Sequence, residues 1–285
     1  MSEWLVSTEW LERNLGNPRI VVLDCTWYLP ESGKKGVDDF REAHIPGARF
    51  LDLNAVSDPD SPYVNMMPTA ERFAAEVGRL GVGNDTLVVI YDAIYVSARI
   101  WWMFRGFGHD RVRILDGGWR KWKAEGRPVE TGDGPPATAA TFVPSPQGGM
   151  VAGWRDVLAA LADGGPAVVD ARTPGRFLGT MGSGYPGVPS GHMPGAINLP
   201  WERFFDAAQN HAFVAPDVAA RIFEEAGVDP SAPLITTCGS GVTAAILGFM
   251  AEHSGGGAGW KLYDGSWHEW GQREDLPKEV GEPKP

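Results

Sequence analysis

The sequence contains only two cysteines, Cys25 and Cys238, among 285 residues. Two thiols cannot build the disulfide framework of a small secreted domain, and a chain of this length does not need one. Neither cysteine belongs to a C-x-x-C pair or to a Cys/His cluster, so a structural zinc site is not expected. The sequence therefore predicts no bound metal.

Long apolar runs and an excess of basic residues are also missing. No apolar stretch approaches the roughly 18 residues of a membrane span, and no basic segment followed by an apolar one stands at the N-terminus. The formal net charge of −11 at pH 7 disfavours binding to nucleic-acid phosphates. We therefore expect a cytoplasmic protein with reduced thiols and with neither nucleic-acid nor membrane partners.

Several short motifs occur twice, at a nearly constant offset. The pattern HxPGA stands at 44–48 and again at 192–196, and the pattern DGxW stands at 116–119 and again at 264–267. A repeat this long indicates two whole domains rather than a solenoid.

A segment rich in Gly and Pro separates the two copies. Residues 133–149 show no sustained apolar periodicity, which is typical of a linker. We predict a first domain over 1–132, a linker over 133–149 and a second domain over 150–285.

Each half alternates short apolar runs with amphipathic stretches. Four apolar runs are predicted as buried strands: 20–23, 87–91, 167–169 and 234–237. Helical spacing predicts helices over 69–80, 215–226 and, buried nearly all round, about 242–253. This alternation favours an α/β fold, with a mostly parallel sheet flanked by helices in each domain. In such sheets, ligands lie beyond the carboxyl ends of the strands.

Cys238 stands at such a strand end, in the turn 238–244, which reads CGSGVTA. The glycines allow the chain to curl so that successive N–H groups point inward and form a nest for an anion. The helix that follows adds its positive end, which favours the thiolate, the form that attacks. Cys238 is therefore the predicted nucleophile, whereas Cys25, inside an apolar run, is predicted to lie in the core.

This turn, both HxPGA motifs, both DGxW motifs and the segments 170–172 and 175–177 together resemble the rhodanese superfamily, and more narrowly its 3-mercaptopyruvate sulfurtransferase branch. The resemblance covers nearly the whole chain. It implies two tandem rhodanese-like domains with catalysis in the second. The first domain has Asp92 in place of the reactive cysteine, and we expect it to be non-catalytic.

The resemblance also implies a mechanism without a metal or an organic cofactor. The Cys238 thiolate takes the sulfur of 3-mercaptopyruvate as a persulfide, releases pyruvate and passes the sulfur to an acceptor. A thioredoxin-like protein, a small thiol and cyanide all remain open as acceptors. Ser240 is the second expected catalytic residue, and Arg176 is expected to bind the substrate carboxylate. The loop positions expected to contact the substrate are Gly239, Gly241, Val242 and Thr243.

The neutral residues after the cysteine indicate which sulfur donor the site prefers. Thiosulfate is a dianion, and the thiosulfate branch resembles this chain but has basic residues where Gly239 and Ser240 stand here. 3-Mercaptopyruvate is therefore the favoured donor. Thiosulfate as the main donor, and a persulfide carrier without turnover, remain alternatives. A cysteine phosphatase is disfavoured because Ala244 stands where the C-x5-R motif needs its arginine.

Three positions depart from the branch that the chain resembles. Asn54 stands at the position of an acidic residue, Asn65 at that of a histidine, and Tyr185 near that of a second substrate arginine. A Cys-Ser-acid relay therefore lacks its usual acid here. Asp52 is a possible substitute, although a helix-capping role fits it better.

Two histidines could suggest a Cys-His pair. His44 and His192 stand in the two HxPGA motifs, and one of these belongs to the half without the reactive cysteine. A shared structural role is therefore the favoured interpretation.

Overall fold

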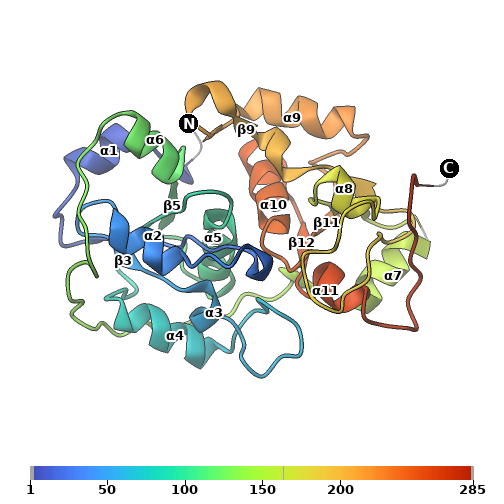
Figure 1. The fold of residues 1–285 in the computed structure, drawn as a ribbon, viewed down its shortest axis with the longest axis horizontal. Helices are drawn as coiled ribbons and strands as arrows, with labels where there is room; N and C mark the ends of the chain where they lie inside the picture. The colour runs from blue at the N-terminus through green and yellow to red at the C-terminus, as the bar shows by residue number, and fades with distance from the viewer. Residues whose placement is uncertain (1–2, 163, 284–285) are drawn as a thin grey trace. The chain divides into compact units, whose positions relative to one another are not determined.

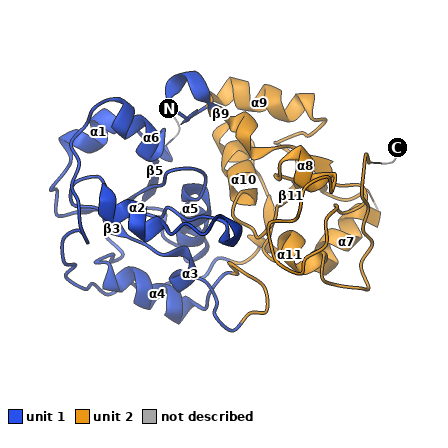
Figure 2. Ribbon diagram, in the orientation of Figure 1, with its two compact units in different colours: residues 1–60, 67–147, 206–213 blue, residues 61–66, 148–205, 214–285 orange. Residues whose placement is uncertain are grey.

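The computed structural model describes residues 3–162 and 164–283, which form two compact units (Figures 1 and 2). Unit 1 contains the described residues up to 60 together with 67–147 and 206–213. Unit 2 contains 61–66 and the described residues of 148–205 and 214–283. Each unit therefore includes a short segment from the other half of the chain.

Unit 1 is built on a five-stranded parallel sheet in the order β1-β5-β4-β2-β3. Its strands are β1 (Leu5–Val6), β2 (Ile20–Asp24), β3 (Arg49–Phe50), β4 (Leu87–Tyr91) and β5 (Val112–Leu115). Its helices are α1 (Thr8–Arg13), the 3-10 turn η1 (Pro30–Ser32), α2 (Gly36–Glu42), α3 (Leu53–Val56), α4 (Ala70–Arg79), α5 (Ser97–Gly106) and α6 (Gly118–Ala124). The apolar pairs of β2 and β4, such as Val22 opposite Val89, lie in the core.

Unit 2 repeats the same topology, with the parallel order β6-β12-β11-β7-β8. Its strands are β6 (Val151–Ala152), β7 (Ala167–Asp170), β8 (Ile197–Asn198), β11 (Leu234–Thr237) and β12 (Lys261–Tyr263). Its helices are α7 (Trp154–Ala162, with residue 163 not described), α8 (Pro174–Phe177), η2 (Trp201–Phe204), α9 (Pro216–Glu225), α10 (Ala244–His253) and α11 (Ser266–Trp270). Between η2 and α9 the chain forms β9 (Phe205–Asp206), η3 (Ala207–Gln209) and β10 (Ala212–Phe213).

The predicted α/β class with parallel sheets is confirmed, and the four predicted strands are found within one residue of their expected ends. The helix after the cysteine turn begins at Ala244, two residues later than its apolar pattern suggested. Val242 and Thr243 instead belong to the turn. In the described part of the chain, no helix has the length and apolar character that a membrane span requires.

The two HxPGA histidines have equivalent structural surroundings. His44 stacks on Phe40, with ring centroids 3.9 Å apart, and His192 stacks on Phe177 at 4.1 Å. Each ring Nδ1 pairs with the carbonyl oxygen of its stacking partner, at 2.8 Å and 3.0 Å. The shared structural role predicted for these histidines is confirmed.

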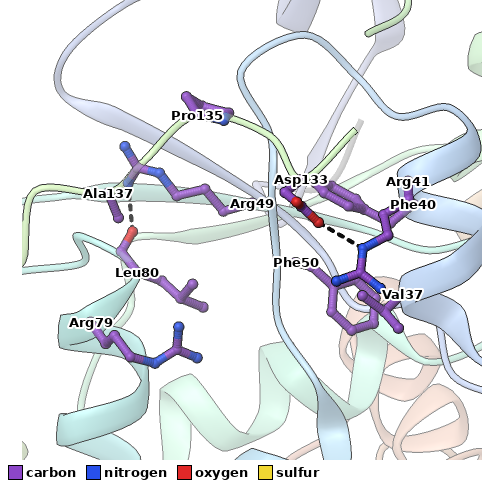
Figure 3. A pocket seen from close by; sticks show the side chains of 10 residues that line it. All are labelled: Val37, Phe40, Arg41, Arg49, Phe50, Arg79, Leu80, Asp133, Pro135 and Ala137. Atoms are coloured by element: carbon purple, nitrogen blue, oxygen red, sulfur yellow. Dashed lines mark hydrogen bonds and ion pairs between the residues drawn. The ribbon is translucent and has the colours of Figure 1, made fainter. Parts of the chain in front are cut away.

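The segment after α6 packs along unit 1. Ala140 N–H donates to the carbonyl oxygen of Gly78 at 2.9 Å, and Ser145 N–H donates to that of Phe107 at 2.8 Å. Figure 3 shows the pocket where this segment begins, with the Arg41 guanidinium paired to Asp133 at 2.6 Å. These contacts hold residues 133–147 on the first domain.

Two matching aspartates at the ends of β2 and β7 have different partners. Asp170 forms a buried ion pair with Arg172, with Nη2 and Oδ2 2.7 Å apart. In unit 1 the corresponding position holds Thr26, whose N–H donates to Asp24 at 2.8 Å but which carries no charge. Burial without a cation raises the pKa of Asp24 to about 6.

We predict that Asp24→Asn stabilises the protein at pH 7. The folded-state pKa of Asp24 lies above its ordinary value of 3.8, so the folded state binds the extra proton between pH 4 and 6. The contribution of Asp24 to stability therefore falls as pH rises through this range. The variant should gain up to roughly 3 kcal/mol above pH 6 and little below pH 4. Urea unfolding at both pH values measures this, and a gain independent of pH would contradict it.

Candidate active site

Cys238 lies at the carboxyl end of β11 and is 2% exposed. The first residues of α11 hold its turn in place. Cys238 N–H donates to the Ser266 hydroxyl at 3.2 Å, and Trp267 N–H donates to the carbonyl oxygen of Cys238 at 2.9 Å. His268 N–H donates to the Gly239 carbonyl oxygen at 2.8 Å. The peptide groups around the sulfur are therefore fixed by α11.

The two glycines of the turn have distinct roles. Gly241 has a φ of 77°, in the left-handed region that other residues rarely adopt. Gly239 lies against Tyr185, and a Cβ at this position would approach Cε2 of the tyrosine ring to 3.0 Å. Gly241 thus permits the curl of the chain, and Gly239 permits the close approach of Tyr185.

The matching turn of unit 1 encloses a carboxylate. Asp92 takes the place of the cysteine, and its side chain folds back into its own turn. Ile94 N–H donates to Asp92 Oδ1, while Val96 N–H and Ser97 N–H donate to Oδ2 at 3.0 Å and 2.6 Å. The turn therefore binds an anion, and in unit 1 that anion is its own side chain.

In unit 2 the same three N–H groups belong to Ser240, Val242 and Thr243. Over the described residues, none of these three N–H groups has a hydrogen-bond acceptor. Ser240 and Val242 are buried, and a buried N–H group without an acceptor carries a free-energy cost. The turn around Cys238 is therefore an anion nest without an anion of its own.

The Ser240 hydroxyl lies in a buried polar cluster. Tyr185 Oη donates to Ser240 Oγ at 2.7 Å, and Asn65 Nδ2 donates to the same oxygen at 3.0 Å. Asn65 comes from the first half of the sequence, in the segment 61–66 that belongs to unit 2. Asn65 and Tyr185, two of the three positions at which the chain departs from the resembled branch, thus both contact Ser240 Oγ.

The segment 61–66 has a counterpart in the repeat. His211, in the segment 206–213 of unit 1, has a φ of 70°, and Asn65 has a φ of 59°. The His211 Nε2 atom pairs with the carbonyl oxygen of Ile94 at 2.7 Å, and Ile94 occupies the position of Ser240 in its own turn. The contact of Asn65 with the cysteine turn therefore belongs to the architecture of the repeat.

Aromatic rings surround the Ser240 cluster. The rings of Tyr185 and Tyr63 both pack edge-on against His268, with centroids 5.1 Å and 6.1 Å away. Partial burial lowers the pKa of His268 below its ordinary value, so the imidazole is neutral near pH 7. The cluster thus lies among uncharged rings.

Arg176 projects from α8 and is half-buried. Its Nη1 donates to the carbonyl oxygen of Gly182 at 3.1 Å, and a Cβ on Gly184 would come within 2.2 Å of the same atom. The residue after Gly184 is Tyr185, the partner of Ser240. Arg176 is thus joined to the cysteine turn through the segment 182–185.

Asn54, Asp52 and Cys25 have other structural roles. Asn54 accepts from Trp27 Nε1 at 3.1 Å within unit 1. Asp52 accepts from the N–H of Asn54 at 2.9 Å and caps α3, which confirms its predicted capping role. Cys25 is fully buried, and this burial raises the pKa of its thiol well above the ordinary value. The core position predicted for Cys25 is confirmed.

Two features of the site were not anticipated from the sequence. The Ser266 hydroxyl supports the peptide of Cys238, and the difference between DGGW and DGSW in the two repeats was the available signal. The Asp92 carboxylate marks the anion nest, which only the folded turn reveals. The described residues contain no group of three or more His, Cys, Asp or Glu arranged to hold a metal ion.

Comparison with known families matches the rhodanese-like domain twice, over residues 7–125 and 154–273. Human 3-mercaptopyruvate sulfurtransferase is 42% identical over 277 residues, covering 94% of this chain and 92% of the human protein. Rat thiosulfate sulfurtransferase is 37% identical over 289 residues, covering 98% of this chain and 96% of the rat protein. The crystal structure of SseA from Escherichia coli, described as a 3-mercaptopyruvate sulfotransferase of the rhodanese fold, superposes with a TM-score of 0.81. It is 32% identical, over 93% of this chain and 99% of SseA.

The nest predicts the effect of filling it with a carboxylate. Cys238→Asp should accept the N–H groups of Ser240, Val242 and Thr243, as Asp92 accepts those of its own turn. The variant should be more stable than Cys238→Ala by about 1–3 kcal/mol, because hydrogen bonds to a charged group replace unsatisfied donors. Calorimetry of the two variants measures the difference.

Cys238→Asn is the matched control, because it keeps the shape of the aspartate without its charge and should gain less. Equal stability of Cys238→Asp and Cys238→Ala would contradict the anion nest.

Proposed function

The chain belongs to the rhodanese family and is a sulfurtransferase, and from this premise we propose that it moves the sulfur of 3-mercaptopyruvate to a thiol through a persulfide on Cys238. The single observation that carries this proposal is the anion nest at Cys238. The equivalent nest of unit 1 holds the Asp92 carboxylate. The nest of unit 2 surrounds a cysteine instead.

The aspartate side chain and a cysteine persulfide have the same length. A carboxylate oxygen of aspartate lies three bonds from its Cα, and so does the outer sulfur of a cysteine persulfide. The position of Asp92 Oδ2 in unit 1 therefore supports a bound persulfide sulfur at the N–H groups of Val242 and Thr243. These donors are in place before the reaction, as electrostatic stabilisation of a developing charge requires.

The first half-reaction transfers sulfur to the enzyme. The Cys238 thiolate attacks the sulfur of 3-mercaptopyruvate, so that an S–S bond forms and the C–S bond of the substrate breaks. The electron pair of that C–S bond leaves as the enolate of pyruvate, which takes up a proton at carbon. An acceptor thiolate then attacks the outer sulfur of the persulfide and restores the Cys238 thiolate.

Two features of the site favour 3-mercaptopyruvate over thiosulfate as donor. Gly239 and Ser240 leave the turn without a cationic side chain to neutralise a dianion. Arg176 offers one guanidinium, which suits a single substrate carboxylate. The higher identity to human 3-mercaptopyruvate sulfurtransferase than to rat thiosulfate sulfurtransferase agrees with this preference.

Both cysteines are free thiols, which fits a reducing compartment such as the cytoplasm.

The donor preference is tested by measuring kcat/KM for 3-mercaptopyruvate and for thiosulfate with one common acceptor. We expect a clear preference for 3-mercaptopyruvate, and no turnover of either donor by Cys238→Ser. A preference for thiosulfate would keep the role of Cys238 but overturn the assignment of the donor. Turnover of neither donor by the wild type would favour a persulfide carrier, and turnover by Cys238→Ser would rule out the persulfide.

Arg176→Ala should raise KM for 3-mercaptopyruvate by on the order of 10- to 100-fold, since a hydrogen bond to a charged group contributes about 1.5–3 kcal/mol. Arg203→Ala is the matched control, because Arg203 also lies in unit 2 but pairs with Glu225. Steady-state kinetics measures both variants. If KM is unchanged in Arg176→Ala, Arg176 does not bind the substrate carboxylate.

A further inference from the structure

The Ser240 hydroxyl accepts two hydrogen bonds inside the protein. The donors are Tyr185 Oη at 2.7 Å and Asn65 Nδ2 at 3.0 Å. All three side chains are buried, with exposed fractions of 2% for Ser240, 5% for Asn65 and 8% for Tyr185. Bulk water therefore does not compete strongly for this oxygen.

This arrangement decides which way the Ser240 proton points. A hydroxyl has two lone pairs and one proton. Tyr185 and Asn65 occupy both lone pairs, so the remaining capacity of Ser240 is to donate. A buried O–H group needs an acceptor, and a base that removes a proton needs a free lone pair. Ser240 is therefore set to donate a hydrogen bond and not to act as a base.

We propose, on the basis of the function proposed above, that Tyr185 and Asn65 are positioning residues that direct the Ser240 O–H group at the enolate oxygen of the leaving pyruvate. As the C–S bond of 3-mercaptopyruvate breaks, its electron pair forms the enolate, whose oxygen gains negative charge. The Ser240 O–H group stabilises this charge by a hydrogen bond. The enolate then takes its proton at carbon from water, and Ser240 keeps its own proton.

The surrounding contacts connect this donor to the candidate carboxylate site through one segment, 182–185. Arg176 contacts the segment 182–184 directly, through Nη1 and the Gly182 carbonyl oxygen. The Ser183 hydroxyl holds the next part of the segment by accepting from Tyr185 N–H at 3.2 Å. In 3-mercaptopyruvate the carboxylate and the keto oxygen are on adjacent carbons. A single short segment therefore positions the donors for both groups.

The test separates the two half-reactions in single turnovers. Rapid mixing of enzyme with a stoichiometric amount of 3-mercaptopyruvate gives the rate of pyruvate release, which needs the enolate donor. Mixing of the preformed persulfide with cyanide gives the rate of thiocyanate formation, in which no enolate forms. The variants are Tyr185→Phe and Asn65→Asp. Asn65 has a φ of 59°, a conformation that aspartate also tolerates.

We expect pyruvate release to slow about 10-fold in Tyr185→Phe, because one of the two orienting hydrogen bonds is lost. In Asn65→Asp, a carboxylate accepts the Ser240 proton and turns it away, so release should slow about 100-fold, as for loss of an oxyanion donor. Discharge of the persulfide by cyanide should stay within about twofold of the wild type in both variants. Ser190→Ala is the matched control, because it removes a different side-chain hydrogen bond of the same loop, that to the Met181 carbonyl oxygen.

Three results would contradict these expectations. Equal slowing of both half-reactions in Tyr185→Phe and Asn65→Asp would mean a merely structural role and would overturn the proposal. Unchanged or faster pyruvate release in Asn65→Asp would mean that Ser240 acts as a base. If wild-type enzyme forms no persulfide from 3-mercaptopyruvate, the proposed function itself fails, and this result is recognised before any variant is compared.

Discussion

The structure depends on the inward-pointing N–H groups of the turn that follows the central strand of each sheet. Three convergent N–H donors in one turn, two of them on buried residues, favour an acceptor with negative charge. In unit 1 the Asp92 carboxylate is that acceptor. In unit 2, over the described residues, the matching N–H groups have no acceptor, and Cys238 stands in place of the carboxylate. The same backbone arrangement therefore surrounds a carboxylate in one half and a cysteine in the other.

This difference links stability and function within one chain. The cysteine turn is held from outside by α11, through the Ser266 hydroxyl and the N–H groups of Trp267 and His268. These contacts hold the peptide groups of Cys238 and Gly239 in place although the nest contains no anion. An empty, preorganised nest has a free-energy cost in the folded protein. In the proposed reaction, it would lower the cost of the charge that develops. In unit 1, the Asp92 carboxylate accepts the N–H groups and so removes the cost of unsatisfied donors. The same carboxylate fills the nest, which is then not open to another anion.

Much of this could be predicted from the sequence, because the decisive signals are local. Apolar runs and turn motifs predict the repeat, the parallel sheets and the position of Cys238 at a strand end. The cluster around Ser240 could not be derived in the same way, because Asn65, Tyr185 and Ser240 are far apart in the chain. The pKa of Asp24 likewise depends on the absence of a cation beside it, and only comparison of Thr26 with Arg172 in the folded units reveals this. Local patterns thus predicted the elements, and long-range contacts determine their chemistry.

The two kinds of donor around Cys238 also bear on the choice of substrate. Negative charge develops at two places when 3-mercaptopyruvate reacts: on the transferred sulfur and on the enolate oxygen. The N–H groups of Val242 and Thr243 suit the first, and the Ser240 hydroxyl, oriented by Tyr185 and Asn65, suits the second. Thiosulfate releases sulfite, an anion that is stable without protonation and needs no enolate donor. In the proposed mechanism, a site that holds an oriented hydroxyl but no cationic side chain in its turn therefore suits an enolate leaving group. We therefore propose that donor selectivity follows from the leaving group more than from the sulfur that is transferred.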